Sequence, residues 1–316
     1  MTDTLNRPAT LDAMIGQGET IARLRIAMGG AARRGVPAPH VLLSGPAGHG
    51  KTTLARIIAE ETGGALVVTS GPALAKKGDL AGIFCAATRG TIIFIDEIHR
   101  MPAAVEETLY EALEDGVISV VVGSGPNARA VTLPFEPVVV VGATTKPGSL
   151  STPLRDRFGL QLTVQPYSDA ELAQIVERSW NHAQVHYAEG SADVVAERSK
   201  GVPRLALHLA ARVLDCAAIS GDEITPELTT LAMEAFGVGR GGIDEIDLRI
   251  IDTLVNVFGG RPVGLANLAQ ALDLDAATIQ EQHEGPLVRA GLIIRTAQGR
   301  MATPLAHEWV RARGAA

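Results

Sequence analysis

The stretch His40-Val-Leu-Leu-Ser-Gly45-Pro-Ala-Gly-His-Gly-Lys51-Thr52 joins an apolar run to a glycine-rich turn, and a helical pattern from Thr53 to Glu61 follows it. Its last eight residues match the phosphate-loop pattern G-x-x-x-x-G-K-[ST], between a strand and a helix. Glycines let backbone N–H groups face phosphate oxygens there, and the helix N-terminus adds positive potential. The stretch therefore predicts a nucleotide site in which Lys51 reaches the β and γ phosphates and Thr52 offers a hydroxyl to Mg²⁺. The candidate nucleotide-binding residues of this loop are Gly45, Gly48, Gly50, Lys51, Thr52 and Thr53.

Four more apolar, β-branched runs follow, and helical patterns separate most of them. Strands buried on both faces of a sheet have this composition, and alternation with helices is typical of a parallel sheet covered by helices on both sides. We therefore predict an α/β domain over residues 1–166. The four runs are Ala65–Thr69, Thr91–Asp96, Val138–Ala143 and Leu160–Val164.

Polar side chains end two of these runs. Asp96 and Glu97 close the run that begins at Thr91, and this pair suits an Mg²⁺ ligand followed by a group that polarises the attacking water. Thr144 and Thr145 end the next buried run, where a hydroxyl can sense the γ-phosphate or simply satisfy the strand terminus. Thr145 is our candidate for the sensor.

Two arginines stand directly before the last strand, in Leu154-Arg155-Asp156-Arg157-Phe158-Gly159. An arginine that reaches the γ-phosphate of a neighbouring subunit would stabilise charge in the transition state. A surface ion-pair cluster with Asp156 explains the same residues equally well. Spacing alone does not separate the two interpretations.

The rest of the chain predicts two smaller domains. Strand patterns stop after residue 166, and helical periodicity predicts an all-helical domain over residues 167–238. The glycine-rich segment 237–242 is a candidate hinge. Residues 243–316 show short helical patterns and then a predicted hairpin around Gln298-Gly299, an order typical of a winged helix.

Composition limits the function classes. The chain has 316 residues and a net charge of -7, which argues against a protein that binds nucleic acid nonspecifically over its whole surface. Only 3% of the residues are aromatic, which argues against a surface on which bases of a single strand stack. Residues 286–316 nevertheless hold five arginines and one glutamate, so a local phosphate contact is compatible with the charge. We find no apolar run long enough for a membrane span and no secretory signal. The two cysteines, Cys85 and Cys216, are too few to form the set of disulfide bonds that is typical of small secreted proteins. We expect a cytoplasmic protein.

Several longer stretches resemble the RuvB family of bacterial Holliday-junction branch-migration motors, which are AAA+ ATPases. The resemblance extends from about Arg7 to Ala306 and implies an AAA+ domain, a helical lid and a winged helix. The run Phe94-Ile-Asp-Glu-Ile-His-Arg100 and the Ser-Gly-Pro element are more specific than the general ATPase motifs. The stretches that carry the resemblance are Arg7–Gln17, Thr69–Ala73, Gly78–Leu80, Phe94–Arg100, Gly142–Thr145, Pro153–Gly159, Pro262–Leu265 and Gly299–Thr303.

The resemblance implies roles around the nucleotide. It places Leu11 to Ile15 and Tyr167 near the adenine, makes Arg157 the arginine that acts in trans, and makes Arg204 the lid arginine that senses the γ-phosphate in cis. Hydrolysis would then move the lid against the sheet domain.

It also implies roles for two hairpins. An inserted hairpin within Glu114–Leu133 would dock a RuvA-like partner through an exposed face that carries Ile118, Val120 and Val122. Packing of these residues on their own domain is the alternative. The C-terminal hairpin would contact DNA through Arg295 and Arg300.

The implied function is an ATP- and Mg²⁺-dependent DNA translocase that drives branch migration as a hexameric ring, with four-way junction or duplex DNA, a RuvA-like protein and a RuvC-like nuclease as partners. Departures from the family pattern keep an alternative open, because the wing turn Ala297-Gln298 lacks the usual Pro and Arg, and Ala47 and His49 replace Pro and Leu in the phosphate loop. We expect His49 to face solvent. The alternative is a divergent loader or scaffold that remodels another complex. A small-molecule kinase is disfavoured because it needs neither a lid arginine nor a wing.

Overall fold

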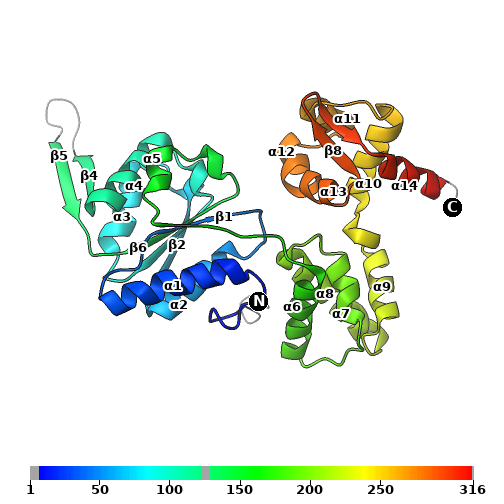
Figure 1. Cartoon of the computed structure of the whole chain (residues 1–316), viewed down its shortest axis with the longest axis horizontal. Coiled ribbons are helices and arrows are strands. Elements are labelled where there is room, and N and C mark those ends of the chain that lie inside the picture. Colours follow the sequence, from blue (N-terminus) through cyan, green and yellow to red (C-terminus); the bar gives the residue numbers. More distant parts are fainter. Residues whose placement is uncertain (1–6, 123–128, 315–316) are drawn as a thin grey trace. The chain divides into compact units, whose positions relative to one another are not determined.

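The structure is a computed structural model that describes residues 7–122 and 129–314. The chain divides into two compact units, Met1–Tyr167 and Ser168–Ala316, and each is described by itself. In Figure 1 the first unit carries the blue to green sheet, and the second unit carries the green, yellow and red helices.

The first unit is built on a five-stranded parallel sheet with the order β2-β3-β6-β1-β7. Each predicted run forms a strand, with bounds that differ from the prediction by about one residue, so the predicted parallel sheet is confirmed. Because all five strands are parallel, their carboxyl ends meet at one edge of the sheet. The strands are β1 (Val41–Ser44), β2 (Leu66–Ser70), β3 (Ile92–Asp96), β6 (Val139–Thr144) and β7 (Leu160–Thr163).

Helices cover both faces of this sheet (Figure 1). Alternate residues of β3 point to opposite faces, so Ile93 and Ile95 join one hydrophobic cluster while Ile92 and Phe94 join the other. The first cluster also contains residues of α3 (Lys77–Ala86), α4 (Ala103–Asp115) and α5 (Thr152–Asp156), and the second contains residues of α1 (Gly18–Arg34) and α2 (Lys51–Thr62). Burial on both sides explains why the strands are continuously apolar.

A half-buried histidine lies directly before β1. His40 precedes β1, and its Nδ1 accepts a hydrogen bond of 3.0 Å from the Val140 N–H. Burial lowers the pKa of His40 to about 4. The imidazole is therefore neutral in the folded protein at pH 7.

The predicted inserted hairpin is present as β4 (Val117–Val122) and β5 (Arg129–Pro134), which pair antiparallel. The expectation that Ile118 is exposed is wrong: it is fully buried and belongs to the hydrophobic cluster on α3 and α4. Val120 is partly buried against the same cluster, and the side chain of Val122 lies outside the described residues. Ile118 and Val120 share one side of the strand because they are two residues apart, and packing against α3 and α4 buries that side. Val131, which pairs with Val120 on the second strand, is exposed.

The second unit begins with a helical lid. Its helices are α6 (Asp169–His182), α7 (Ser191–Glu197), α8 (Pro203–Ser220) and α9 (Pro226–Ala235). Ser168 and Glu171 form a capping box that starts α6, which satisfies N–H groups that a helix N-terminus otherwise leaves unpaired. Trp180 is fully buried and donates from its indole N–H to Ala210 O at 3.3 Å, which ties α6 to α8.

The glycine-rich segment that we predicted as a hinge is a packed turn. It forms η5 (Arg240–Gly242), in which the Gly242 N–H donates to Gly239 O at 3.1 Å. A Cβ on Gly242 would lie 2.4 Å from Arg198 O and 2.9 Å from Lys200 Cγ. The turn therefore lies directly against the loop after α7, and only glycine fits there.

A compact winged-helix fold follows. The strands β8 (Ile293–Thr296) and β9 (Gly299–Ala302) form the hairpin that the sequence predicts. One hydrophobic cluster joins its helices to the hairpin, with Ile250, Leu268 and Leu287 fully buried. The helical segments are α10 (Glu245–Asp252), the π-helical η6 (Thr253–Val257), α11 (Leu265–Leu272), α12 (Ala276–Thr278), the π-helical η7 (Ile279–Glu284), α13 (Gly285–Arg289) and α14 (Pro304–Gly314).

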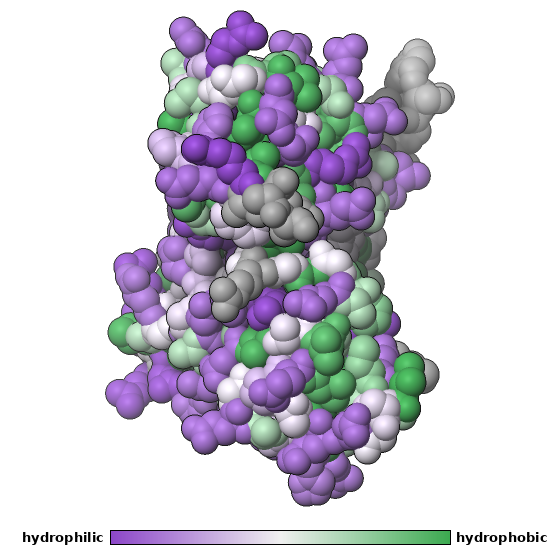
Figure 2. Space-filling view, turned by 90° about the vertical axis from the view of Figure 1, so that its right-hand side faces the viewer, coloured by the Kyte–Doolittle hydropathy of each residue, from purple (hydrophilic) through white to green (hydrophobic). Residues whose placement is uncertain are grey.

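The surface of this unit is mixed. Figure 2 shows hydrophilic residues spread over the face, while hydrophobic residues gather on its lower half, which the lid forms. Ile219, Leu231 and Phe236 are exposed hydrophobic side chains of the lid. Within residues 7–122 and 129–314, no helix combines the length and the apolar character that crossing a bilayer requires.

Candidate nucleotide and DNA sites

The phosphate loop leads from β1 into α2 at the carboxyl edge of the sheet. Gly45 has φ 142°, and a Cβ there would lie 2.5 Å from Val164 O, so this position requires glycine. Gly48 and Gly50 have φ 78° and 93°. The Lys51 ammonium is buried and donates to Gly45 O at 2.8 Å and to Pro46 O at 2.9 Å, which holds it inside the curve of the loop.

His49 departs from the expectation. It is 2% exposed rather than facing solvent, and its Nδ1 lies 2.8 Å from Ala47 O. The imidazole therefore contacts the phosphate loop from inside the fold. Thr52 and Thr53, the next two candidate residues after Lys51, are half-buried in the first turn of α2.

Asp96 and Glu97 follow β3 at the same edge. Glu97 has φ 47°, a left-handed conformation that is uncommon outside glycine, and its N–H donates to Asp96 Oδ1 at 3.0 Å. The Ser-Gly-Pro element packs against this turn, because a Cβ on Gly71 would lie 2.3 Å from Glu97 O. The glycine after β2 thus allows two chain segments to meet behind the acidic pair.

The two threonines after β6 have different surroundings. Thr145 Oγ1 donates to Glu97 Oε2 at 3.4 Å. Thr144 is fully buried, shares a hydrogen bond of 2.9 Å with His99 Nδ1 and accepts one of 2.9 Å from the Lys146 N–H. Thr144 therefore satisfies the strand terminus, whereas Thr145 lies beside the candidate catalytic carboxylate.

His99 connects these groups and was not among the predicted site residues. Its Nε2 lies 3.4 Å from Glu97 Oε2, and its other ring nitrogen contacts Thr144. The signal was present in the Asp-Glu-Ile-His run, but only the fold shows that the ring bridges β3 and β6.

The segment predicted to lie near the adenine folds beside the phosphate loop. Leu11 is buried in the second hydrophobic cluster, and its N–H donates to Glu61 Oε1 at 3.1 Å; Ile15 is half-buried. Tyr167 is also buried, and a Cβ on Gly50 would lie 3.7 Å from its hydroxyl. Leu11 and Tyr167 thus approach the phosphate-loop helix from two different parts of the chain.

Arg157 is the C-cap residue of α5, and its side chain contacts residues of α4. It forms an ion pair with Glu114, donates to the Tyr110 hydroxyl at 3.0 Å, and its guanidinium carbon lies 5.1 Å from the centre of the Tyr110 ring. The hydrogen bond that Arg157 donates to the Tyr110 hydroxyl and the charge of Glu114 raise the pKa of Arg157 above its ordinary value. Among the residues that the structure describes, Arg157 pairs with Glu114 rather than with the Asp156 that the sequence suggested.

Arg204 is exposed at the start of α8, after Pro203 at the first helical position. It belongs to the second unit, and the phosphate loop belongs to the first. The structure therefore places this residue on the lid.

Both wing arginines contact one buried acid. Arg295 forms an ion pair with Glu284 Oε1, and Arg300 donates to Glu284 Oε2 at 2.9 Å. The Glu284 side chain is 0% exposed, whereas those of Arg300 and Arg295 are 18% and 58% exposed. Sequence reasoning missed Glu284, because its side chain meets the hairpin only in the folded domain.

These features together define a class. A parallel sheet with a phosphate loop after β1, an acidic pair after the neighbouring strand β3, a helical lid and a C-terminal winged helix are the parts of an AAA+ ATPase.

Comparison with known proteins defines the family. Three family models match in succession: the Holliday junction DNA helicase RuvB P-loop domain over residues 6–164, the RuvB AAA lid domain over 167–239 and the RuvB C-terminal winged helix domain over 240–311. The chain belongs to the RuvB family. The Holliday junction branch migration complex subunit RuvB of Parafrankia sp. is 48% identical, over 95% of this chain and 85% of that protein. The corresponding protein of Pseudothermotoga lettingae is 45% identical, over 96% of this chain and 88% of its own length.

A solved structure agrees with this assignment. The Thermotoga maritima RuvB Holliday junction branch migration motor superimposes with a TM-score of 0.88 at 40% sequence identity. The match covers 98% of this chain and 99% of the other. The likeness thus extends over all three domains.

Proposed function

We propose that this protein is an ATP-driven motor that moves duplex DNA during Holliday-junction branch migration, as part of a hexameric ring. One observation carries the proposal. The adjacent strands β3, β6 and β1 end together at one edge of the sheet, with the acidic pair, Thr145 and the Lys51 loop on their carboxyl ends. A winged helix on the same chain supplies the DNA-binding part.

The residues present fit a nucleotide with Mg²⁺. The Thr52 hydroxyl and the Asp96 carboxylate are the hard oxygen ligands that Mg²⁺ prefers, and the ion would screen phosphate charge when bound. Lys51 binds the β and γ phosphates, for which it leaves the two loop carbonyls it now contacts. Glu97 orients and polarises the attacking water, and the Thr145 hydroxyl fixes the position of its carboxylate.

We infer that the subunit interface completes the site. Arg157 would reach the γ-phosphate of a neighbouring protomer, and Arg204 would contact it from the lid of its own chain. The partly exposed Arg157 supports this role, since its contacts with Tyr110 and Glu114 hold it near the surface rather than in the core. A RuvA-like protein would dock on the inserted hairpin, where Val131 offers an exposed apolar side chain. A RuvC-like nuclease is a further expected partner.

Movement of a synthetic four-way junction with ATP, with and without RuvA, tests the motor. We expect Lys51→Ala to abolish turnover and Glu97→Gln to bind ATP without hydrolysing it. Arg157→Ala rings should regain hydrolysis when mixed with Lys51→Ala subunits, because each variant supplies what the other lacks. Hydrolysis without any junction movement would instead support the loader or scaffold.

A further inference from the structure

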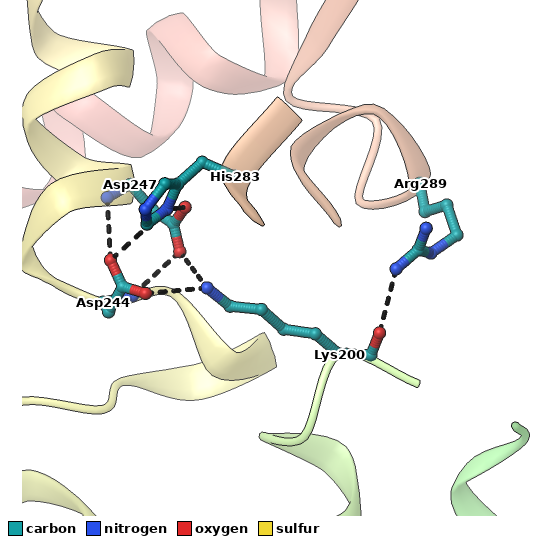
Figure 3. Close-up of polar contacts among 5 residues, drawn as sticks. All are labelled: Lys200, Asp244, Asp247, His283 and Arg289. Atoms are coloured by element: carbon teal, nitrogen blue, oxygen red, sulfur yellow. Dashed lines mark hydrogen bonds and ion pairs between the residues drawn. The ribbon is translucent and has the colours of Figure 1, made fainter. Parts of the chain in front are cut away.

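A buried polar network connects the lid to the winged helix. Lys200, in the loop between α7 and α8, donates from its ammonium to Asp244 Oδ2 at 2.8 Å and to Asp247 Oδ2 at 2.5 Å (Figure 3). The Asp247 side chain is 0% exposed and that of Lys200 is 7% exposed. A charge pair with so little solvent contact is held in one geometry, because separation would leave both charges buried and unpaired.

The two acidic residues of the network are also held by contacts that do not involve Lys200. Asp244 and Asp247 form the capping box of α10, in which each carboxylate accepts the backbone N–H of the other residue. His283 Nδ1 lies 2.8 Å from Asp247 Oδ1, and an ionised carboxylate only accepts, so this nitrogen carries the proton. Burial by itself would raise the pKa of Asp247, but the hydrogen bond from His283 and the charge of Lys200 outweigh it and lower that pKa.

Two acids and a histidine within reach of one another also resemble a metal site. Here the Lys200 ammonium already supplies the positive charge between the carboxylates. We therefore assign the cluster to the contact between the two domains rather than to an ion.

The backbone of the Lys200 loop is held as well. Lys200 has φ 53° and Gly201 has φ 76°, two successive left-handed residues that position the start of α8. Arg289, at the end of α13, donates to Lys200 O at 2.9 Å, as Figure 3 shows. Gly242 packs against the side chain of the same lysine. The loop is thus attached to the winged-helix domain through its side chain, its carbonyl and its close packing.

This loop lies next to the lid arginine. Lys200 precedes Arg204 by four residues, and Gly201-Val202-Pro203 between them turn directly into α8. On the other side, His283 is followed in η7 by Glu284, which holds Arg295 and Arg300 of the wing. The polar contacts around Lys200 and those around the wing arginines thus end on two consecutive residues, His283 and Glu284.

We propose that Lys200 is a positioning residue that fixes the Arg204 loop to the winged-helix domain, so that the lid and the wing respond to the nucleotide as one body. The proposal rests on the motor function above. Its consequence is that DNA affinity differs between the ATP and ADP states because Arg204 and the wing are mechanically joined. If this contact is lost, ATP hydrolysis and DNA binding should each remain, but the bound nucleotide should no longer change the affinity for DNA.

The test measures DNA affinity by fluorescence anisotropy on a labelled duplex, with a slowly hydrolysed ATP analogue and with ADP, and takes the ratio of the two Kd values. The double variant Lys200→Met, Asp247→Asn removes both charges together, which avoids a buried unpaired carboxylate. Arg289→Gln is a second variant that removes no buried charge. Lys77→Met, the same type of substitution at an exposed position of α3, is the control, and thermal unfolding confirms folding of each chain.

In the double variant we expect the ratio to fall at least threefold toward one, with a smaller fall in Arg289→Gln and none in the control. DNA affinity without nucleotide and kcat for ATP without DNA should stay within twofold of the wild type, a split that general destabilisation does not produce. Wild-type ratios in folded variants, or an equal fall in the control, overturn the proposal. If the double variant does not fold, Arg289→Gln decides alone. A wild-type protein that neither hydrolyses ATP nor binds DNA would instead refute the proposed function.

Discussion

The two wing arginines differ in exposure, and this difference separates folding from DNA binding. The perturbation is the pair of single variants Arg295→Ala and Arg300→Ala, each of which removes one partner of the buried Glu284 carboxylate. Arg261→Ala is a matched control in the same domain. Arg261 is exposed, and its guanidinium donates a hydrogen bond to the carbonyl of Phe258, three residues earlier in the chain.

The magnitudes follow from burial. Removal of one partner from a buried ion pair costs about 3–5 kcal/mol. Arg300→Ala leaves Glu284 with the largely solvated Arg295, so we expect the lower end, about 3 kcal/mol. Arg295 is 58% exposed, and an exposed pair is worth about 1 kcal/mol or less. The expected difference in the free energy of unfolding is therefore about 2 kcal/mol, with Arg300→Ala the less stable.

Urea unfolding of the full chain measures this difference. Trp309 packs on the winged-helix core and Trp180 lies in the lid, so fluorescence reports on both parts of the second unit. DNA binding is then measured across a salt series. Loss of one phosphate contact in Arg295→Ala should reduce the slope of log K against log salt by about 0.9.

The reasoning fails if Arg300→Ala is as stable as the control, or if Arg295→Ala is the more destabilised of the two. Either result would mean that Glu284 does not depend on Arg300 for its charge partner. An unchanged salt slope in Arg295→Ala would refute a phosphate contact by that arginine while leaving the stability argument intact.

Three further predictions concern the first unit. Thr145→Val should slow ATP hydrolysis at least tenfold with nucleotide binding retained. Thr144→Val should lower the free energy of unfolding by about 1–3 kcal/mol, because it removes a buried hydroxyl that bonds to His99 Nδ1 and to the Lys146 N–H. The opposite pattern of effects would contradict the roles of the two threonines. His40 binds protons more readily in the unfolded chain, so stability should fall by up to about 3 kcal/mol as the pH drops from 6.5 to about 4, and urea unfolding of His40→Gln should lack that component. Gly45→Ala should abolish nucleotide binding in calorimetry, because its Cβ would collide with Val164 O, and near-normal affinity would show that the loop can shift.

The sequence alone predicted the parts of this protein whose signals are local. The phosphate loop, the five strands, the C-terminal hairpin and the helical lid each appear in a short run of residues with a recognisable pattern, and the resemblance to the RuvB family implied the inserted hairpin. Side-chain periodicity and glycine placement depend on only a few neighbouring residues, so they can be recognised without knowledge of the fold. The acidic pair after β3 could be placed for the same reason.

Tertiary structure decided which partners these residues have. Alternation along β4 could not say which face was buried, and packing on α3 and α4 turned Ile118 inward. Likewise, no local pattern indicates that Glu284 holds both wing arginines, that Glu114 holds Arg157, or that Lys200 joins the lid to the winged helix. Charge pairing and burial depend on distances between segments far apart in the chain, and only the folded backbone sets those distances.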